Sequence, residues 1–573
     1  MKKYFLPLIV VLAASCCRPK DGEYVLHLLT TNDVHGRYFD STYVSDKTLP
    51  SLQNVAWYAD SLRSAAGKEN VILIDAGDFL QGDNAAYYYN FVDPVSEHLF
   101  SRMAEYIGYD AVVAGNHDIE TGHPVYDRLT ASMDVPLLAA NAVRTDSRRP
   151  YFQDYVCLKK GGLKIAVIGF TNPNIKGWLS PEIWEGMDFL SLIPFAQQQV
   201  DMVRRKENPD VVIVAAHAGT GNGDGSQLEN QGMDLFRSLR GVDFVVCAHD
   251  HRPVVHKTDS ICLINSGSHC ANLGHGIVSL SVRDGKVTAK KLDASLLPVN
   301  KDKVDRRMQA HFHDDYLAVK KFTLKEVGSL DVDLDTRDAY AGMSDYLNLL
   351  HTLSLSCSPA QISFAAPLKF NASVQKGTLV YNDLFTIYPY ENQLFVISMT
   401  GKEIKDYLEY SYDLWINTVS RPGDHVLKIV NAPDPRTAQK NWSFVNRPYN
   451  FDSAAGVNYT VDVTKPFGSR ISIESLADGT PFDMSASYNV AITSYRANGG
   501  GGIMNKGAGV AETGNRVVAY HKEIRSILYD YLLTHGTIDP AAIGDPEKIG
   551  QWKFIPESVV SPAMERDMSL LFP

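Results

Sequence analysis

The chain has 573 residues, of which 45% are hydrophobic and 21% are charged, and its formal net charge at neutral pH is −11. This length exceeds what one hydrophobic core usually holds, so two large globular domains are expected. An acidic chain without a basic run lacks the charged face that nucleic-acid polymers require, which excludes polymer binding. A small anion can still bind, because divalent cations can reverse the local field.

The first residues have the pattern of a bacterial export signal. Two lysines precede an apolar stretch, residues 4–14, that is too short to span a membrane. The stretch leads into Ala-Ala-Ser-Cys, so residues 1–17 are predicted to be a lipoprotein signal peptide with Cys16 as the lipidated residue. Cys17 and simple secretion are the alternatives. A lipid chain anchors a protein without spanning the bilayer, so we expect a periplasmic or cell-surface lipoprotein that touches the membrane only through this anchor.

From about residue 24 to residue 300, apolar runs alternate with amphipathic helices such as Leu52–Ala66, a pattern typical of an α/β domain. In open α/β sheets, ligands gather beyond the carboxyl ends of the strands. The residues that follow each apolar run are therefore expected to meet at one site. The predicted buried strands are Val25–Thr31, Val71–Asp75, Ala111–Ala114, Val211–Ala215 and Phe244–Cys247.

Each predicted strand is followed by residue types that bind metals. The candidate ligands are Asp33, His35, Asp78, Asn116, His217, His249 and His251. Borderline divalent metals accept mixed imidazole, carboxylate and amide ligands. Side chains two residues apart on an extended strand lie on the same side, so Asp33 and His35 can chelate one ion. The pattern predicts two divalent ions of the Zn, Mn, Co or Fe type, bridged by Asp78.

A pair of such ions lowers the pKa of a bound water, holds the resulting hydroxide in line with phosphorus and neutralises the phosphoryl oxygens. His117 is then the candidate hydrogen-bond donor or general acid near the leaving oxygen. Asp118 or Glu120 could orient His117 and raise its pKa by charge pairing. The remaining histidines, His269 among them, lack the strand-end pattern and are predicted to be surface or packing residues.

The cysteines beyond the predicted signal peptide show no CxxC spacing, which argues against a zinc ribbon or a redox motif. In an exported protein Cys262 and Cys270 could pair, and buried free thiols are the alternative.

The second half of the chain differs from the first half in its pattern of apolar, polar and glycine residues. Residues 301–322 are polar and helix-compatible and are predicted to connect two domains. Residues 323–555 combine a helix-like stretch, Tyr346–Leu353, with strand-like segments and glycine-rich turns, as in an α+β domain. The segment after Gly544 is polar and contains prolines, so it is expected to run over the surface, with residues 556–573 as a tail.

The strand-end motifs resemble those of the calcineurin-type metallophosphoesterases, and nearly the whole chain is similar to the exported 5′-nucleotidase family. The resemblance implies an α/β metallophosphoesterase sandwich joined by a helix to an α+β nucleotide-binding domain. It also implies a catalytic histidine at His117, whose usual partner is an Asp three residues on, where this chain has Glu120. The implied ligands of one metal are Asp33, His35, Asp78 and His251, and those of the other are Asp78, Asn116, His217 and His249.

Two segments of the second half are similar to those that cover the two faces of a nucleotide base in this family. They are Tyr388–Asn392 and Tyr495–Gly502. The resemblance implies that Tyr390 and Tyr495 stack on the base, an interaction worth roughly 1–3 kcal/mol. Lys369 and Asn392 are the further substrate-binding candidates.

Two departures leave the substrate subtype open. The Asp that contacts ribose hydroxyls in typical 5′-nucleotidases is missing near Gly501. Segments Ser363–Lys369 and Tyr449–Asp452 resemble the 2′,3′-cyclic-nucleotide 2′-phosphodiesterase/3′-nucleotidase branch, whereas the Tyr388–Asn392 loop is similar to the 5′-nucleotidase branch.

The sequence therefore predicts an exported dimetal enzyme that releases phosphate from small nucleotides by hydroxide attack on phosphorus. The cyclic-nucleotide phosphodiesterase/3′-nucleotidase is the alternative within the same class. A lipoprotein that binds nucleotides without hydrolysis is the alternative from another class. It is disfavoured because Asp78, Asn116 and His117 are all present. The sequence makes no prediction of oligomeric state.

Overall fold

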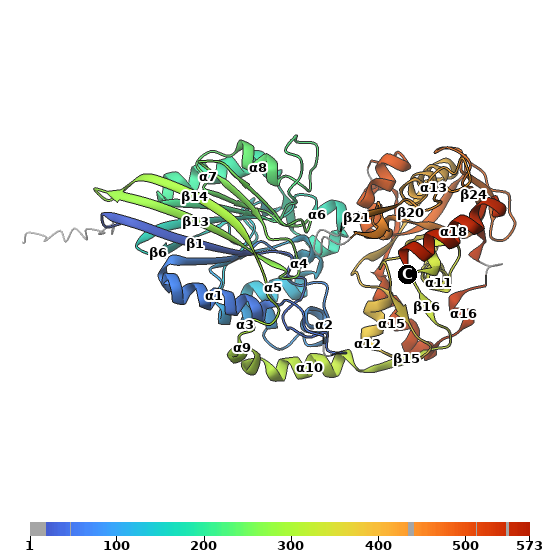
Figure 1. Cartoon of the computed structure of the whole chain (residues 1–573), viewed down its shortest axis with the longest axis horizontal. Helices are drawn as coiled ribbons and strands as arrows, with labels where there is room; N and C mark the ends of the chain where they lie inside the picture. The colour runs from blue at the N-terminus through green and yellow to red at the C-terminus, as the bar shows by residue number, and fades with distance from the viewer. Residues whose placement is uncertain (1–18, 46, 434–439, 512, 546–548) are drawn as a thin grey trace, which may run out of the picture.

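The computed structural model describes residues 19–45, 47–433, 440–511, 513–545 and 549–573, which form two bodies (Figure 1). The predicted signal peptide and Cys16 lie outside these residues. Within the described ranges, no helix combines the length and the apolar character that crossing a membrane requires.

The first sheet of the N-terminal body mixes parallel and antiparallel pairing. In spatial order its strands are β14 (Lys286–Pro298), β13 (Asn272–Arg283), β1 (Gly22–Thr31), β2 (Val71–Asp75), β3 (Ala111–Val113) and β4 (Leu137–Leu138). Strands β1 to β4 run parallel, and β13 pairs antiparallel with β1. Helices α1 (Leu52–Ala66) and α3 (Leu99–Ile107) cover the outer face of this sheet.

The second sheet lies face to face with the first. In spatial order its strands are β11 (Val254–Lys257), β12 (Cys262–Asn265), β10 (Phe244–Val246), β9 (Val211–Ala216), β7 (Leu163–Phe170) and β6 (Tyr155–Lys160). Helices α7 (Leu192–Glu207) and α8 (Gly232–Ser238) cover its outer face. The body is thus a sandwich of two sheets between two layers of helices.

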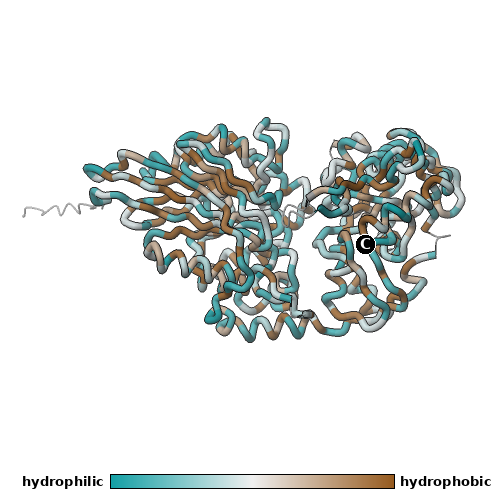
Figure 2. The backbone as a smooth tube through the Cα atoms, in the orientation of Figure 1, coloured by the Kyte–Doolittle hydropathy of each residue, from teal (hydrophilic) through white to brown (hydrophobic). Residues whose placement is uncertain are grey.

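Apolar runs build this sandwich because successive strand side chains point to opposite faces. Ile72 and Ile74 pack against the second sheet, whereas Val71 and Leu73 pack against the helices. A strand that is apolar at every position is expected where both faces are buried. Figure 2 shows the hydrophobic strands inside this body and more hydrophilic stretches on the helices around them. The predicted α/β metallophosphoesterase sandwich is confirmed.

The C-terminal body is built on a mixed sheet. In spatial order its strands are β23 (Ser453–Ala455), β17 (Ile362–Ala365), β26 (Ser487–Thr493), β20 (Gln393–Thr400) and β27 (Val517–Glu523). Helix α13 (Gly401–Trp415) covers one face. The other face is covered by α11 (Asp345–Ser356), α12 (Tyr381–Ile387) and α15 (Ile524–His535). This arrangement is the predicted α+β domain.

Two short helices, α9 (Arg306–His311) and α10 (His313–Thr323), lie along the edge that joins the two bodies (Figure 1). They meet at Phe312, whose ring is buried in the N-terminal core. The bodies also contact each other through α2 (Asn84–Tyr87). The Asn84 amide donates to Asn382 Oδ1 at 3.1 Å, and the ring centroids of Tyr87 and Phe385 are 5.7 Å apart.

The segment after Gly544 differs from the expectation of a surface extension. Its strand β29 (Trp552–Ile555) pairs in parallel with β24 (Val457–Asp462). Helix α18 (Glu557–Leu571) then buries one apolar face in the core of the C-terminal body. The polar residues and the internal Pro562 obscure the helical spacing of the buried side chains, which are Val560, Ala563, Met564 and Leu571.

The five cysteines of the described chain are free. Cys262 and Cys270 are both buried and do not form the pair considered from the sequence. The alternative of buried free thiols therefore describes them.

Asp567 of α18 tests whether this helix is integral to the C-terminal body. Its fully buried carboxylate accepts the Leu427 N–H at 2.9 Å and lies 2.5 Å from His425 Nδ1. Asp567→Ala leaves both donors unpaired, so we expect the free energy of unfolding to fall by about 1–3 kcal/mol in urea titrations. The exposed Glu565→Ala on the same helix is the control, with an expected change within about 0.5 kcal/mol. Equal effects of the two substitutions would contradict this prediction.

Candidate functional site

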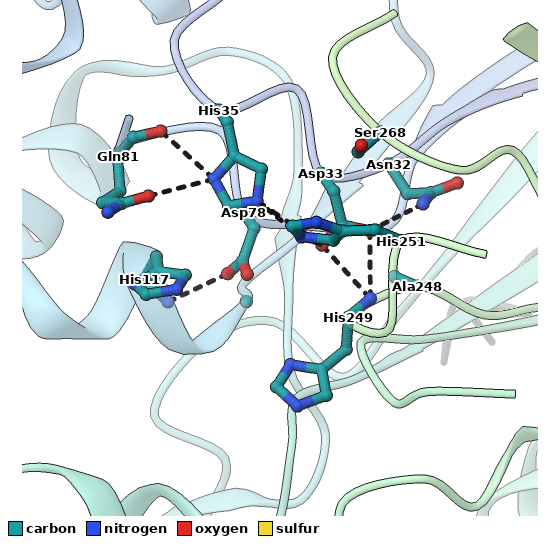
Figure 3. A network of polar contacts seen from close by, with 12 residues as sticks. Asn32, Asp33, His35, Asp78, Gln81, His117, Ala248, His249, His251 and Ser268 are labelled. Atoms are coloured by element: carbon teal, nitrogen blue, oxygen red, sulfur yellow. Dashed lines mark hydrogen bonds and ion pairs between the residues drawn. The ribbon is translucent and has the colours of Figure 1, made fainter. Parts of the chain in front are cut away.

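Left-handed backbone turns follow three of the strands. The angle φ is 48° at Asp33, 49° at His35, 62° at Asp78, 66° at His249 and 56° at His251. Residues other than glycine rarely adopt such angles, and the strain persists only where the surroundings impose it. Figure 3 shows the outcome: side chains from separate strand ends converge on one volume.

Asp118 holds the loop after β2 in place. It lies on α4 (Asn116–Glu120), and its carboxylate accepts the backbone N–H groups of Gly115 and of residues 78–80 at 2.7–2.9 Å. A Cβ on Gly115 would lie 2.1 Å from Asp78 Oδ1, so only glycine permits this approach. With its oxygens occupied in this way, Asp118 is a positioning residue for the loop, which argues against its predicted alternative role as the partner of His117.

Asp33, His35 and His251 form the first cluster of potential metal ligands. His35 Nε2 lies 2.9 Å from His251 Nε2, and Asp33 Oδ1 lies 3.3 Å from the same His251 atom. On the other edge of its ring, His35 Nδ1 lies 3.1 Å from the side-chain oxygen of Gln81. Burial, with the nearby His251 and His269, lowers the pKa of His35 well below its usual range. The neutral imidazole is the form that binds metals.

Asp78, His217 and His249 form the second cluster. His217 Nδ1 donates to the Ala76 carbonyl oxygen at 2.8 Å, which directs Nε2 to Asp78 Oδ2 at 3.0 Å. His217 Nε2 is buried and makes no hydrogen bond that satisfies it. Asn116 joins this cluster through its Oδ1 atom, 2.9 Å from His249 Nδ1. All seven predicted ligands are therefore brought together.

The donor set fits two divalent cations. It combines imidazole nitrogens, an amide oxygen and two carboxylates, Asp33 and Asp78, that are at most 1% exposed. Burial raises the pKa of Asp78, but the neighbouring His217 and His117 more than offset it, so the pKa lies well below its usual range. Ionised carboxylates this deep require cations close by. The buried His217 Nε2 atom, which faces the same space as Asp78, provides a further electron pair for a metal.

His117 stands beside this set on α4. Its Nδ1 donates to Glu120 Oε2 at 2.5 Å, and its backbone N–H donates to Asp78 Oδ1 at 2.9 Å. Burial lowers the pKa of His117, but the negative charges of Glu120 and Asp78 outweigh it and raise the pKa to about 10. These charges favour the protonated form of His117, and Glu120 occupies the partner position.

His269 contacts the site although the strand-end pattern left it out. Its ring centroid is 5.2 Å from that of His35 and 6.1 Å from that of His251, and its backbone N–H donates to the Asp33 carbonyl oxygen at 2.8 Å. The sequence does contain a signal for His269, because this residue follows the end of a sixth strand, β12, by four residues. Its contact with His35 makes it a neighbour of the first cluster.

A cavity of about 250 Å³ lies between the two bodies. His117 and His251 line it from the N-terminal body, and the predicted Tyr390, Asn392 and Tyr495 line it from the C-terminal body. The remaining lining residues are Phe364, Ala365, Ala366, Leu368, Tyr449, Asp452, Ile492, Thr493 and Arg496. The candidate metal and base sites thus open on one space.

Tyr449 is a third aromatic wall that the sequence did not assign to the site. Its ring centroid is 6.3 Å from that of Tyr390 and 6.4 Å from that of Tyr495, with interplanar angles of 79° and 80°. Both predicted stacking rings are therefore nearly perpendicular to Tyr449. Its position depends on folding, because it comes from a segment far from either ring in the chain.

A buried ion pair fixes these aromatic segments. Arg496 donates to both carboxylate oxygens of Asp452, at 2.8 and 2.9 Å, and to the Tyr449 carbonyl oxygen at 2.6 Å. The bidentate geometry makes this a strong contact. Since Arg496 directly follows Tyr495, it ties the segments of Tyr449 and Tyr495 together.

Lys369 is placed differently from the prediction. Its Nζ donates to the Phe385 carbonyl oxygen at 2.9 Å, and Lys369 is not among the residues that line the cavity. Burial, together with the nearby Arg525, lowers the pKa of Lys369 to about 8. In this arrangement Lys369 supports α12 and does not face the cavity.

Two family models match the chain. The calcineurin-like phosphoesterase model matches residues 26–253, and the 5′-nucleotidase C-terminal domain model matches residues 326–507. The first family uses a centre of two metals, in keeping with the two clusters of Asp and His described above.

Individual relatives are distant. The chain is 25% identical to the trifunctional nucleotide phosphoesterase protein YfkN of Bacillus subtilis, over 90% of this chain but only 38% of that protein. It is 24% identical to a 2′,3′-cyclic-nucleotide 2′-phosphodiesterase/3′-nucleotidase of Haemophilus influenzae, over 93% of this chain and 87% of that protein.

Among solved structures, a candidate 5′-nucleotidase from Staphylococcus aureus, in complex with α-ketoglutarate, has the same fold. The TM-score is 0.74 at 21% identity, over 92% of this chain and 99% of that one. The fold, the paired clusters of potential metal ligands and the two matched domains all point to the same family. The chain belongs to the 5′-nucleotidase family, as a metallophosphoesterase hydrolase with a 5′-nucleotidase C-terminal domain.

Proposed function

We propose that this protein hydrolyses phosphate esters of small nucleotides at the cavity between its two bodies. The observation that carries this proposal is the cavity itself, which has His117 and His251 on one side and Tyr390 and Tyr495 on the other. A nucleotide is a phosphate ester joined through a sugar to a flat base, so it matches a cavity with a cationic and metal-binding end and an aromatic end.

The first cluster, Asp33, His35 and His251, would hold one ion, and the second cluster with Asn116 would hold the other. Asp78 would serve both. Two divalent ions of the Zn, Mn, Co or Fe type would supply positive charge to the phosphoryl oxygens and acidify a water molecule.

Glu120 and Asp78 stabilise the protonated form of His117, and this residue lines the cavity. It can therefore donate a hydrogen bond to a phosphoryl oxygen, or a proton to the leaving oxygen. Glu120 orients the ring through Nδ1.

Tyr390 and Tyr495 would bind the base by stacking, which tolerates any base identity. Asn392 lines the same end of the cavity and can add a polar contact to the base or sugar.

A 2′,3′-cyclic-nucleotide 2′-phosphodiesterase/3′-nucleotidase is the second candidate. It is favoured by the Ser363–Lys369 segment, part of which lines the cavity, and by the named activity of the Haemophilus influenzae relative. We also propose that the protein is exported and anchored by a lipid on Cys16, on the basis of its N-terminal sequence alone.

Phosphate release from 5′-AMP, 3′-AMP and 2′,3′-cyclic AMP tests the function. The protein lacking residues 1–17 is assayed with Mn²⁺ and with a chelator, and a phosphomonoesterase is added for the cyclic ester. Chelator-sensitive turnover of at least one ester is expected. Turnover of 5′-AMP alone identifies a 5′-nucleotidase, and turnover of the other two esters identifies the second candidate. No turnover of any of them contradicts the proposal.

Two substitutions separate metal binding from proton donation. Asp78→Ala removes the carboxylate common to both clusters, so we expect loss of both metals and of all activity. His117→Ala is expected to retain both metals and lower kcat by about 100- to 10,000-fold, the usual contribution of a general acid. Metal content by mass spectrometry and steady-state kinetics report the two effects. Loss of metal in His117→Ala would show that its assigned role is wrong.

Tyr495→Ala removes one face of the proposed base site. Stacking worth roughly 1–3 kcal/mol corresponds to a rise in KM for nucleotides of about 5- to 150-fold. Turnover of p-nitrophenyl phosphate, which has no base, should change little. Tyr520→Ala on β27, outside the cavity lining, is the control and should leave both values near those of the unaltered protein. An equal loss on both substrates would argue against stacking.

A further inference from the structure

The loop between β9 and α8 holds Glu229 in a defined place. The Glu229 carbonyl oxygen accepts the Gly219 N–H at 3.0 Å and the Asn172 amide at 3.1 Å. A Cβ on Gly219 would lie 1.9 Å from Asn230 Oδ1, so the two ends of this loop pack without spare room. Glu229 is therefore fixed at its backbone, three residues before α8 begins at Gly232.

The carboxylate of Glu229 lies beside the second metal-ligand cluster. Its Oε2 atom is 3.7 Å from His249 Nε2, and its side chain is 44% exposed. The side-chain oxygens have no hydrogen-bond partner among the described residues. An ionised carboxylate only accepts hydrogen bonds, so this one is open to a donor from a ligand.

The same carboxylate does not line the cavity, but it is within electrostatic range of the base end. Burial is the main cause of the raised pKa of Tyr495, about 12, and the negative charge of Glu229 adds to it. Helix α6 (Ile175–Trp178) links the second metal-ligand cluster to the base end of the cavity. The ring of Trp178 stacks on that of His249, with the centroids 5.1 Å apart. The same helix lies against α14 (Ser494–Ala497), which carries Tyr495. Figure 1 shows α6 on the side of the N-terminal body that faces the C-terminal body.

Glu229 thus lies beside the second metal-ligand cluster and within electrostatic range of a proposed stacking ring. In a nucleotide, the part between the phosphate and the base is the sugar, whose hydroxyl groups are hydrogen-bond donors. We propose that Glu229 accepts a hydrogen bond from a sugar hydroxyl and so selects ribonucleotides over their deoxy counterparts. This proposal rests on the nucleotide phosphohydrolase function proposed above.

The selectivity follows from the cost of an unpaired charge. A ribonucleotide replaces the water that solvates Glu229 with its own hydroxyl. A deoxynucleotide displaces that water without supplying a donor, and a site built to bind a hydroxyl rejects the analogue that lacks it. Glu229 would be a specificity-determining residue, with no part in the metal chemistry.

The test compares matched substrate pairs in the metal-loaded protein. The ribonucleotide is 5′-AMP or 3′-AMP, whichever the protein hydrolyses, and kcat/KM is measured for it and for its deoxy forms. For 5′-AMP these are the 2′-deoxy and 3′-deoxy compounds, and for 3′-AMP they are the 2′-deoxy and 5′-deoxy compounds. The variants are Glu229→Ala and Glu229→Gln. Asp224→Asn is the control, because it removes one negative charge from the same loop, and the Asp224 side chain accepts its hydrogen bonds from Ser226. Bound metal is measured in every variant.

We expect the unaltered protein to prefer the ribonucleotide over one deoxy form. In Glu229→Ala that preference should fall about tenfold, as expected for the loss of one hydrogen bond to a charged group. The fall should come mainly from a higher KM for the ribonucleotide. Glu229→Gln, which keeps an acceptor oxygen, should fall less, and Asp224→Asn should leave the preference unchanged.

Three results would overturn the proposal. Loss of bound metal in Glu229→Ala would make Glu229 a metal ligand. An equal fall in kcat/KM for the ribonucleotide and the deoxynucleotide would make its role structural. Unchanged kcat/KM for both substrates would leave it without a role in selection. Absence of chelator-sensitive turnover of any nucleotide by the unaltered protein is a separate result, which would remove the proposed function and this inference with it.

Discussion

Two carboxylates removed from solvent, Asp33 and Asp78, lie close together, and the architecture of the N-terminal body serves to compensate their charge. A buried carboxylate costs several kcal/mol unless it is paired and hydrogen-bonded. Here backbone N–H groups of His249 and His117 donate to the two carboxylates, and imidazoles surround them. The left-handed turns after β1, β2 and β10 bring these groups within reach. Compensation of the two buried charges thus offsets the free-energy cost of the strained backbone at the strand ends.

In the proposed function, chemistry and recognition would belong to different bodies of the molecule. The metal-ligand clusters and His117 come from the N-terminal sandwich, whereas the aromatic walls come from the C-terminal body, where the Arg496–Asp452 pair aligns them. The bodies touch at Asn84 and Tyr87, near the connecting helices, and again where α6 lies against α14 beside the cavity. In the proposed function, substitutions in the aromatic segments would therefore alter which ester is bound more than they alter the residues that act on it.

The sequence predicted which side chains the fold brings together, because each candidate ligand follows an apolar run and strand assignment alone placed it. Asp118 was ambiguous, because residues 118 and 120 are both near His117 in the chain. Only the folded loop shows that the Asp118 oxygens accept backbone N–H groups. Tyr449 and Glu229 could not be assigned, since their contacts join segments far apart in the sequence. His269 was missed although it follows the end of a sixth strand, β12. The buried face of α18 was hidden by polar neighbours and an internal proline.

The position of α18 has a consequence for biosynthesis. Strands β13 and β14 complete the first sheet of the N-terminal body by residue 298, whereas the C-terminal body needs β29 and α18, which end at residue 571. Domains generally fold as units during synthesis, starting from the N-terminus. The sandwich can therefore close while the chain is still being synthesised, whereas the C-terminal body must wait for β29 and α18. In stalled or truncated products, proteases would meet an incomplete second body attached to a finished first one.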